Sequence, residues 1–439
     1  MLGGGESGVG SAVLAHVKGF EVFLSDSGSL KEGYRETLKK YGIPFEEGGH
    51  TESLILNADE VIKSPGIPET APMVVALRAR NIPIISEIEF AGRYDKARKI
   101  CITGSNGKTT TTSLIYYLLK DAGLNVGLGG NIGKSYAMQV AFGEHDIYVL
   151  ELSSFQLDGM YDFKADIAIL MNITPDHLDR YDNCFQNYIN AKFRITQNMK
   201  EEDCFIFCGD DEVTIGELGK IVLRAKMLPF SQERKVECGA WSENGTMKIN
   251  IDGDTFSMDE EEIAIKGKHN VYNSMAAALT GKLMKVSNDN IRKSLSSFEG
   301  VEHRMEKVLS VGGVLYVNDS KATNVNSTWY ALESVKTPIV LILGGKDKGN
   351  DYEPIYDLVR EKVKAIVCLG VDNRKIHECF EDKVSAIYDT LSTDECVKKC
   401  AELAVEGDTV LLSPCCASFD LFKSYEDRGR QFKESVRKL

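Results

Sequence analysis

The stretch from Ile100 to Leu119, ICITGSNGKTTTTSLIYYLL, constrains the fold more than any other part of this sequence. An apolar β-branched run leads into a Gly-rich turn, which a lysine, two threonines and a segment of helical periodicity follow. A strand, a glycine loop and a helix in this order are typical of a phosphate site, because the loop N–H groups point inward and the helix dipole favours an anion. The loop departs from G-x-x-x-x-G-K-[ST] in one respect, since Ile102 stands at the first glycine position.

The chemistry of this loop assigns roles to single residues. Lys108 is placed to reach the β- and γ-phosphates of a nucleotide, and Thr109 to bind Mg²⁺. A second magnesium ligand is expected from Glu151, which ends the apolar run DIYVLEL and should lie on a neighbouring parallel strand. The residues predicted to line the phosphate site are Gly104, Ser105, Asn106, Gly107, Lys108, Thr109 and Thr110.

Two further residues are candidates at the same edge of the sheet. His177 follows the apolar run ADIAILMNI, and the carboxyl ends of parallel strands are where α/β proteins place ligands. Lys192 falls on the apolar face of the helix predicted around FQNYINAKF. Its ammonium group either extends along that face to the surface or is desolvated, with a lowered pKa that makes the amine available for chemistry. Spacing alone does not choose between these two.

A second glycine loop, GGGESG at residues 3–8, fits G-x-G-x-x-G, and Asp26 follows where a ribose-binding acid would lie. The motif alone is weak, so a dinucleotide, another nucleotide-like ligand and a purely structural turn all stay open. Only Met1 and Leu2 precede the glycines, so we expect the first strand of this region to be shortened.

Apolar runs alternate with helical patterns along the chain and predict an α/β fold with parallel sheets. The segment CGAWSENGTMKINIDGDTFSM instead alternates with period two around Asn244-Gly245, which predicts an antiparallel insert with a hairpin turn. We expect three domains in series: residues 1–93, Rossmann-like; residues 94–299, a central P-loop domain with the antiparallel insert; and residues 300–439, again Rossmann-like.

Composition excludes several classes of partner. The 439 residues carry 52 Lys and Arg against 65 Asp and Glu, a net charge of −13, which disfavours general binding to nucleic acid. No apolar run approaches the ~20 residues of a membrane helix, and there is no signal-peptide pattern. The eleven cysteines include no C-x-x-C pair, so we expect reduced, mostly buried thiols of a cytoplasmic protein and no zinc ligands.

The whole chain resembles the Mur ligase family, and most closely its member that adds D-glutamate to UDP-N-acetylmuramoyl-L-alanine. The segments that carry the resemblance, in family order, are TGSNGKTT, LELSSFQL, NITPDHLDRY, YINAKFRI, KGKHNVYN, VEHRME, NDSKATN, LGGKDKG and LLSPCCASFDLFKSYEDRG. The family implies that ATP phosphorylates the substrate carboxylate and that the D-glutamate amine attacks the acyl phosphate, in peptidoglycan precursor synthesis. We also expect a monomer, without nucleic-acid partners or membrane insertion.

The same resemblance implies roles for matching residues. Thr109 and Glu151 would hold one Mg²⁺, and His177 and Lys192 a second, with Lys192 carbamylated by CO₂. The ATP contacts implied beyond the loop are Asn270, Asn273, Arg304 and Asp319. The UDP-sugar contacts implied are Glu6, Ser7, Gly8, Asp26, Ser27, Ser64, Gly66 and Asn131. The D-glutamate contacts implied are Lys321, Thr323, Lys348, Ser418 and Tyr425, the last at a position that is commonly Phe.

Three rival functions make different predictions. A sibling ligase would add another amino acid. A P-loop switch protein should carry an N-K-x-D guanine motif, and none is present. A dinucleotide-dependent oxidoreductase would use the first glycine loop and leave the second unexplained.

Overall fold

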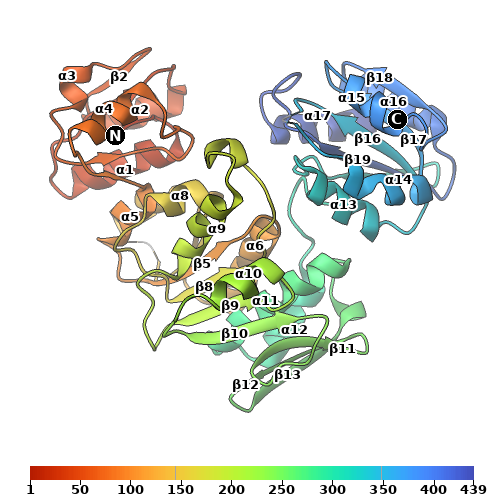
Figure 1. The fold of residues 1–439 in the computed structure, drawn as a ribbon, viewed down its shortest axis with the longest axis horizontal. Coiled ribbons are helices and arrows are strands. Elements are labelled where there is room, and N and C mark those ends of the chain that lie inside the picture. Colours follow the sequence, from red (N-terminus) through yellow and green to blue (C-terminus); the bar gives the residue numbers. More distant parts are fainter. Residues whose placement is uncertain (144, 348) are drawn as a thin grey trace. The chain divides into compact units, whose positions relative to one another are not determined.

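The computed structural model describes residues 1–143, 145–347 and 349–439 (Figure 1). These residues form two compact units. The first unit comprises Met1–Ile263 with Val271–Phe298, and the second comprises Ala264–Asn270 with Glu299–Leu439. The three domain boundaries expected from the sequence stay predictions. Among the described residues, no helix combines the length and the apolar character needed to cross a bilayer.

The first strand of the chain is reduced to a single paired residue, Leu2, which forms parallel bridges with both Ser25 and Lys63. The Leu2 N–H donates to the Ile62 carbonyl at 2.9 Å, and the side chain is buried. Leu2 thus connects two short parallel sheets and delivers the glycine loop, as the expected shortening implies. The strands are β1 (Leu24–Asp26), β2 (Phe45–Glu47), β3 (Val61–Ile62) and β4 (Ile84–Ile85). The helices are α1 (Glu6–Val17), α2 (Glu32–Lys40), α3 (Glu52–Ile55), α4 (Pro72–Ala79) and α5 (Glu87–Gly92).

The rest of the first unit is built on a nine-stranded sheet of order β13-β12-β11-β10-β9-β8-β5-β7-β6. Its members are β5 (Arg98–Thr103), β6 (Val126–Gly130), β7 (Ile147–Glu151), β8 (Ile167–Leu170), β9 (Cys204–Cys208), β10 (Lys226–Ser231), β11 (Gly239–Glu243), β12 (Thr246–Ile251) and β13 (Asp254–Asp259). The apolar strands β5, β7, β8 and β9 pair in parallel and are buried, as expected for a sheet with helices on both faces.

The predicted antiparallel insert extends this same sheet. Strands β11, β12 and β13 pair antiparallel, and the hairpin turn between β11 and β12 is at Asn244 and Gly245, whose φ angles of 53° and 74° suit a two-residue turn. The helices around the sheet are α6 (Lys108–Asp121), α7 (Tyr136–Phe142), α8 (Ser154–Asp158), α9 (Phe185–Phe193), α10 (Glu212–Leu218), α11 (Lys268–Leu283) and α12 (Asn288–Ser297). Short 3₁₀ turns are η1 (Leu178–Arg180), η2 (Arg194–Thr196) and η3 (Glu260–Glu262).

The second unit has a six-stranded sheet of order β14-β15-β19-β16-β17-β18, in which only the β14–β15 pair is antiparallel. Its strands are β14 (Glu306–Val311), β15 (Val314–Asn318), β16 (Ile339–Gly344), β17 (Val363–Leu369), β18 (Ile387–Thr390) and β19 (Thr409–Cys415). Its helical segments are α13 (Val325–Ser334), η4 (Glu353–Ile355), α14 (Tyr356–Lys362), α15 (Arg374–Phe380), α16 (Thr393–Leu403) and α17 (Tyr425–Val436). Apolar clusters fill both faces of this sheet.

Helix α5 holds the N-terminal part of the first unit against its large sheet with two buried carboxylates. Glu87 accepts from the Ser135 hydroxyl and the Ala137 N–H at the start of α7. Glu89 accepts three backbone N–H groups with one oxygen, from residues 161, 162 and 163, at 2.9–3.1 Å. Because these donors are partly or fully buried, the carboxylate of Glu89 is their main hydrogen-bond acceptor.

We therefore expect Glu89→Ala to lower the free energy of unfolding of the first unit by about 3 kcal/mol or more, since three partly or fully buried N–H groups lose their acceptor. Urea unfolding followed by far-ultraviolet circular dichroism checks this. Glu60→Ala is the matched control, because Glu60 forms a partly exposed ion pair with Arg93, the same arginine that lies 3.5 Å from Glu89. That pair is worth about 1 kcal/mol or less. Equal losses in the two variants would contradict this role for Glu89.

Candidate active site

The phosphate loop lies between β5 and α6 and requires glycine at two positions. Gly104 and Gly107 have φ angles of 150° and 81°. A Cβ at Gly104 would lie 2.9 Å from the Met171 side chain, and one at Gly107 would lie 2.7 Å from Asn273 Oδ1. The loop is therefore closely surrounded, and side chains other than hydrogen would displace it.

Residues after β8 fix the loop from one side. The Ser105 N–H donates to the Asn172 carbonyl, and the Asn106 N–H to Asn172 Oδ1, both at 2.9 Å. The Ser105 hydroxyl donates to the Thr174 carbonyl at 2.8 Å and lies 3.1 Å from the Tyr188 hydroxyl on α9. Asn172, Thr174 and Tyr188 were not predicted as site residues, because they lie far from the loop in the chain and only the fold brings them to it.

Lys108 begins α6 and bends back over its own loop. Its Nζ donates to the Gly104 carbonyl at 2.7 Å and to the Ser105 carbonyl at 2.8 Å. The ammonium group is thus held at the loop that should cradle phosphates, where a phosphate oxygen would be a stronger, charged acceptor than a carbonyl.

Thr109 and Glu151, the two residues expected to bind magnesium, are both buried. Thr109 lies in the first turn of α6, and Glu151 ends β7, opposite Ile102 of β5. Glu151 also receives a hydrogen bond: Asn131 Nδ2 donates to its Oε1 at 2.7 Å. The structure therefore brings together Asn131 and Glu151, which the resemblance assigned to different ligands.

Lys192 on α9 is 1% exposed, so its side chain does not reach the surface. Its Nζ lies 4.8 Å from the centre of the Tyr188 ring. Burial holds the pKa of Lys192 well below its usual value, and Lys108 lowers it further, while Asp176, Glu151 and Asp158 partly oppose the shift. Of the two possibilities that the spacing left open, the structure supports the desolvated amine, within electrostatic reach of Lys108 and Glu151.

His177 lies in the loop after β8, in the left-handed conformation with a φ of 52°. Its Nε2 is 3.7 Å from Asp176 Oδ2, and its ring packs edge-on against Phe155, 5.2 Å between centres. The Arg180 guanidinium lies over Phe155 at 4.4 Å. Asp176, next to His177, partly opposes the lowering of the Lys192 pKa by its negative charge. The His177 loop and α9 therefore face a common region.

The residues expected to bind the UDP-sugar surround the first glycine loop. Asp26 accepts from the Gly4 and Gly28 N–H groups at 2.6 and 2.7 Å. Glu6 accepts from the Tyr34 hydroxyl at 2.9 Å and from the Ser135 N–H at 3.2 Å. Ser64 donates to the Gly3 carbonyl at 3.3 Å. Ser7 and Gly8 lie in the first turn of α1, Ser27 follows β1, and Gly66 lies in the turn after β3. The carboxylates of Glu6 and Asp26 thus accept hydrogen bonds from the protein, a use that the glycine motif does not reveal.

Two asparagines on α11, Asn270 and Asn273, were expected to contact ATP. Asn273 accepts from the Thr111 hydroxyl at 3.1 Å and lies against Gly107, so it is next to the phosphate loop. Asn270 donates to the Lys266 carbonyl at 2.8 Å.

In the second unit, Asp319 follows β15 and is buried. It accepts from the Met305 N–H at 3.2 Å and the Ser413 hydroxyl at 2.9 Å. Burial raises the pKa of Asp319 to about 7, and the nearby Arg304 guanidinium opposes this rise. Arg304 and Asp319, the two residues expected to contribute ATP contacts from this domain, therefore lie close together.

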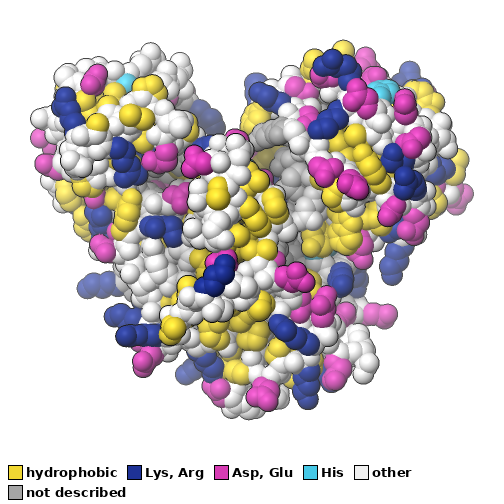
Figure 2. Space-filling model, viewed as in Figure 1, with side chains coloured by type: hydrophobic (Ala, Val, Ile, Leu, Met, Phe, Trp, Pro, Cys, Tyr) yellow, Lys and Arg dark blue, Asp and Glu magenta, His cyan; other side chains and the backbone are white. Residues whose placement is uncertain are grey.

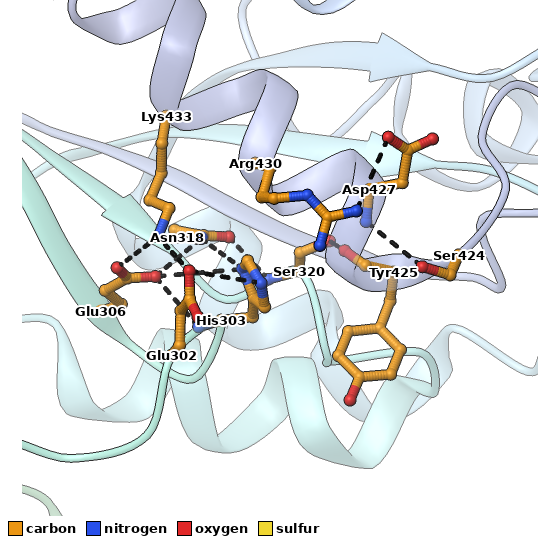
Figure 3. Close-up of polar contacts among 10 residues, drawn as sticks. All are labelled: Glu302, His303, Glu306, Asn318, Ser320, Ser424, Tyr425, Asp427, Arg430 and Lys433. Atoms are coloured by element: carbon orange, nitrogen blue, oxygen red, sulfur yellow. Dashed lines mark hydrogen bonds and ion pairs between the residues drawn. The ribbon is translucent and has the colours of Figure 1, made fainter. Parts of the chain in front are cut away.

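A polar network holds the turn that carries Arg304 (Figure 3). Lys433 donates to Glu302 and Glu306, and Asn318 Nδ2 donates to Glu306 at 2.9 Å and lies 2.9 Å from His303 Nδ1. His303 itself is buried, with a φ of 65°. The network supports the backbone on both sides of Arg304.

The described residues among those expected to bind D-glutamate lie at the carboxyl end of the same sheet. Lys321 Nζ is 5.3 Å from the centre of the Tyr425 ring, and Ser418 is buried in the segment after β19. Thr323 precedes α13. Lys348 lies outside the described residues. Arg428, which the sequence analysis did not single out, is fully buried and donates to the Ser320 hydroxyl at 3.0 Å and to the Cys416 carbonyl.

Charged side chains of both signs are interspersed on the face drawn in Figure 2, with Asp and Glu beside Lys and Arg over each part of the chain.

A phosphate loop with a buried carboxylate and a buried lysine near it defines the protein as a P-loop enzyme of the nucleotide-using class.

Comparison with known proteins identifies the family. The family model of the MurD N-terminal domain matches residues 3–73, that of the Mur ligase middle domain residues 102–281, and that of the Mur ligase, glutamate ligase domain, residues 303–416. The chain is 60% identical over 441 residues to a UDP-N-acetylmuramoylalanine–D-glutamate ligase of Bacteroides fragilis, covering 100% of this chain and 99% of that protein. A relative of the same name from Porphyromonas gingivalis is 55% identical over 442 residues, with 100% and 98% covered.

Solved structures agree on the fold. A pseudomurein peptide ligase type C from Methanothermus fervidus aligns with a TM-score of 0.64 at 21% identity, and the alignment covers 100% of this chain and 98% of the other. The UDP-N-acetylmuramate-alanine ligase MurC from Thermotoga maritima gives the same TM-score and coverage at 19% identity. The predicted three-domain α/β architecture is confirmed.

The chain belongs to the Mur ligase family, whose members form peptide bonds with ATP and Mg²⁺ in peptidoglycan synthesis. The predictions of an ATP-dependent ligase and of the family resemblance are therefore confirmed.

Proposed function

We propose that this enzyme joins D-glutamate to UDP-N-acetylmuramoyl-L-alanine in the cytoplasm, using ATP and passing through an acyl phosphate. The observation that supports this substrate pair most strongly is the 60% identity over the full chain to a ligase of that name. A carboxylate is a poor electrophile because oxide is a poor leaving group, and phosphorylation replaces it with phosphate. The D-glutamate amine then attacks the acyl carbon and releases phosphate.

In this proposal, residues of the first unit neutralise the negative charge of the ATP phosphates and of the substrate carboxylate. When ATP binds, Lys108 donates to phosphate oxygens in place of the two loop carbonyls. Its ammonium group then stabilises the charge that develops on the transferred phosphoryl group. The donor set also fits two Mg²⁺ ions. Thr109 and Glu151 offer hard oxygen ligands for one of them. Bound magnesium supplies charge neutralisation between the ATP phosphates and the substrate carboxylate.

Lys192 fits this donor set only as a carbamate, because an ammonium would repel a cation. The neutral amine of a desolvated lysine reacts with CO₂ and forms a carbamate, a carboxylate-like ligand on a long arm. Together with His177 it would hold the second ion. The burial of Lys192 near the phosphate loop is the observation that favours this modification.

The remaining assignments stay proposals. Asn270, Asn273, Arg304 and Asp319 would hold ATP. The UDP-sugar would lie against the first glycine loop and Asn131, and D-glutamate against Lys321, Thr323, Lys348, Ser418 and Tyr425. We propose that the enzyme works as a monomer.

A substrate panel tests the function directly. We expect ADP release only when UDP-N-acetylmuramoyl-L-alanine and D-glutamate are both present. With L-glutamate, turnover should fall by about 10²-fold or more, because the amine or the carboxylates of this enantiomer would be misplaced by more than an ångström. Coupled measurement of ADP with D- and L-amino acids checks this. Preference for L-alanine or a diamino acid would instead assign the chain to a sibling activity.

A further inference from the structure

Three side chains with the chemistry of transition-metal ligands converge in the second unit, at the edge of its sheet that β17 and β18 form. Cys368 near the end of β17 and Asp389 on β18 are register partners on neighbouring parallel strands. His377 lies on α15, which follows β17. One ligand atom from each residue lies within 4.8 Å of the other two. The sequence analysis expected no zinc ligands because no C-x-x-C pair is present, whereas this set is assembled by the sheet.

The spacing of these atoms suits a tetrahedral ion. Zn²⁺ binds sulfur at about 2.3 Å and nitrogen or oxygen at about 2.0–2.2 Å, so neighbouring ligand atoms around it are about 3.4–3.6 Å apart. His377 Nε2 and Asp389 Oδ2 are already 3.1 Å apart. The remaining separations, at most 4.8 Å, need to shorten by about 1.4 Å at most. Small side-chain rotations provide such a movement.

The surroundings orient the ligands and give access to them. Asn373 Nδ2 donates to Asp389 Oδ1 at 2.9 Å, which is the outer-shell hydrogen bond that metal-binding carboxylates usually receive. His377 and Asp389 line an open cavity of about 800 Å³, whose other lining residues include Asp372, Glu378 and Glu395. The Arg374 guanidinium in this lining pairs with Asp372. The excess of carboxylates favours a cation, and the cavity leaves a fourth position for water.

The ligand types select the class of ion. A thiol and an imidazole are poor ligands for Mg²⁺ or Ca²⁺ and good ones for Zn²⁺ and its neighbours. Cys368 is buried beside Asp389, and an ion bound there would replace the thiol proton, because the thiolate is the metal ligand. The other cluster of this kind among the described residues, Glu302, His303 and Glu306, is already neutralised by Lys433 (Figure 3).

We propose that Cys368, His377 and Asp389 form a binding site for a divalent transition metal of the zinc class. Binding forms Cys368 Sγ–metal, His377 Nε2–metal and Asp389 O–metal bonds and releases the thiol proton to solvent. The ion joins α15 to β17 and β18. None of the three residues is among those assigned to ATP, the UDP-sugar or D-glutamate.

Cobalt titration of the full-length, chelator-treated protein tests the site, because Co²⁺ replaces Zn²⁺ and is coloured. We expect one Co²⁺ per chain, visible bands of tetrahedral cobalt and a near-ultraviolet sulfur-to-cobalt band, all removed by added Zn²⁺ and unaffected by Mg²⁺. Cys368→Ser should abolish the sulfur band. Cys379→Ser, which changes another cysteine, on α15, should keep it. Zn²⁺ should also raise the thermal midpoint of the wild-type protein.

His377→Gln keeps the test decisive if Cys368→Ser does not fold, because His377 is 38% exposed and its replacement leaves the core intact. This variant should bind Co²⁺ at least about tenfold more weakly, as expected when one of three protein ligands is lost. A sulfur band that persists in Cys368→Ser, or equal Co²⁺ affinity in wild type and His377→Gln, would overturn the proposal. So would cobalt binding without any sulfur band.

Discussion

Lys108→Ala should reduce ADP release by about 10²- to 10³-fold or more, with the fold retained. The lysine supplies the cation nearest to the transferred phosphoryl group in the proposed mechanism, and loss of one preorganised donor at such a position costs about 3–4 kcal/mol of transition-state stabilisation. Lys108 donates to two carbonyls of its own loop, and the loss of these two hydrogen bonds costs about 1–2 kcal/mol of local stability.

Steady-state ADP release with saturating substrates measures this loss, and thermal unfolding verifies the fold. Lys120→Ala is the matched control, because Lys120 is an exposed residue in the last turn of the same helix, where its Nζ donates to the Tyr116 hydroxyl. The control should keep normal turnover. A folded Lys108→Ala enzyme with turnover close to the control would contradict the assignment of the phosphate loop.

Much of the fold could be predicted from local sequence patterns. The apolar runs of β5, β7 and β8 and the glycine loop after β5 follow from residue type and period, because short-range geometry decides both. The period-two segment with Asn244-Gly245 likewise predicted its hairpin. The family resemblance and the α/β architecture are confirmed by full-length relatives and by solved structures.

The parts that were not predictable depend on contacts between distant segments. The helical spacing of Lys192 is compatible with both a buried and an exposed amine, and only the packing of α9 against the loop of Ser105 and Thr174 settles its burial. The bond from Asn131 to Glu151 follows from parallel pairing of β6 with β7. The three N–H groups on Glu89, the buried Arg428 and the Cys368 cluster are assembled in the same way. The ligand roles of the site residues stay predictions.

Lys192→Ala should lose most activity, by about 10²-fold or more, because the second proposed magnesium site loses its anionic ligand. The truncated side chain leaves a space beside Tyr188 that a small carboxylate fits. We therefore expect formate or acetate to restore part of the ADP release, while acetamide, which has nearly the same shape and no charge, restores none. The restored rate of ADP release should rise with carboxylate concentration and reach a plateau, because the carboxylate binds at one site.

The modification itself has a signature apart from activity. Wild-type enzyme equilibrated with ¹³C-labelled CO₂ should give a carbamate carbonyl resonance that Lys192→Ala lacks. Lys200→Ala, which changes an exposed lysine shortly after the same helix, should keep both the resonance and normal turnover. The amine reacts only when neutral, and burial keeps the pKa of Lys192 low, so the resonance should persist at neutral pH, where an exposed lysine is almost fully protonated. Normal turnover of Lys192→Ala without added carboxylate would mean that Lys192 is only a buried part of α9.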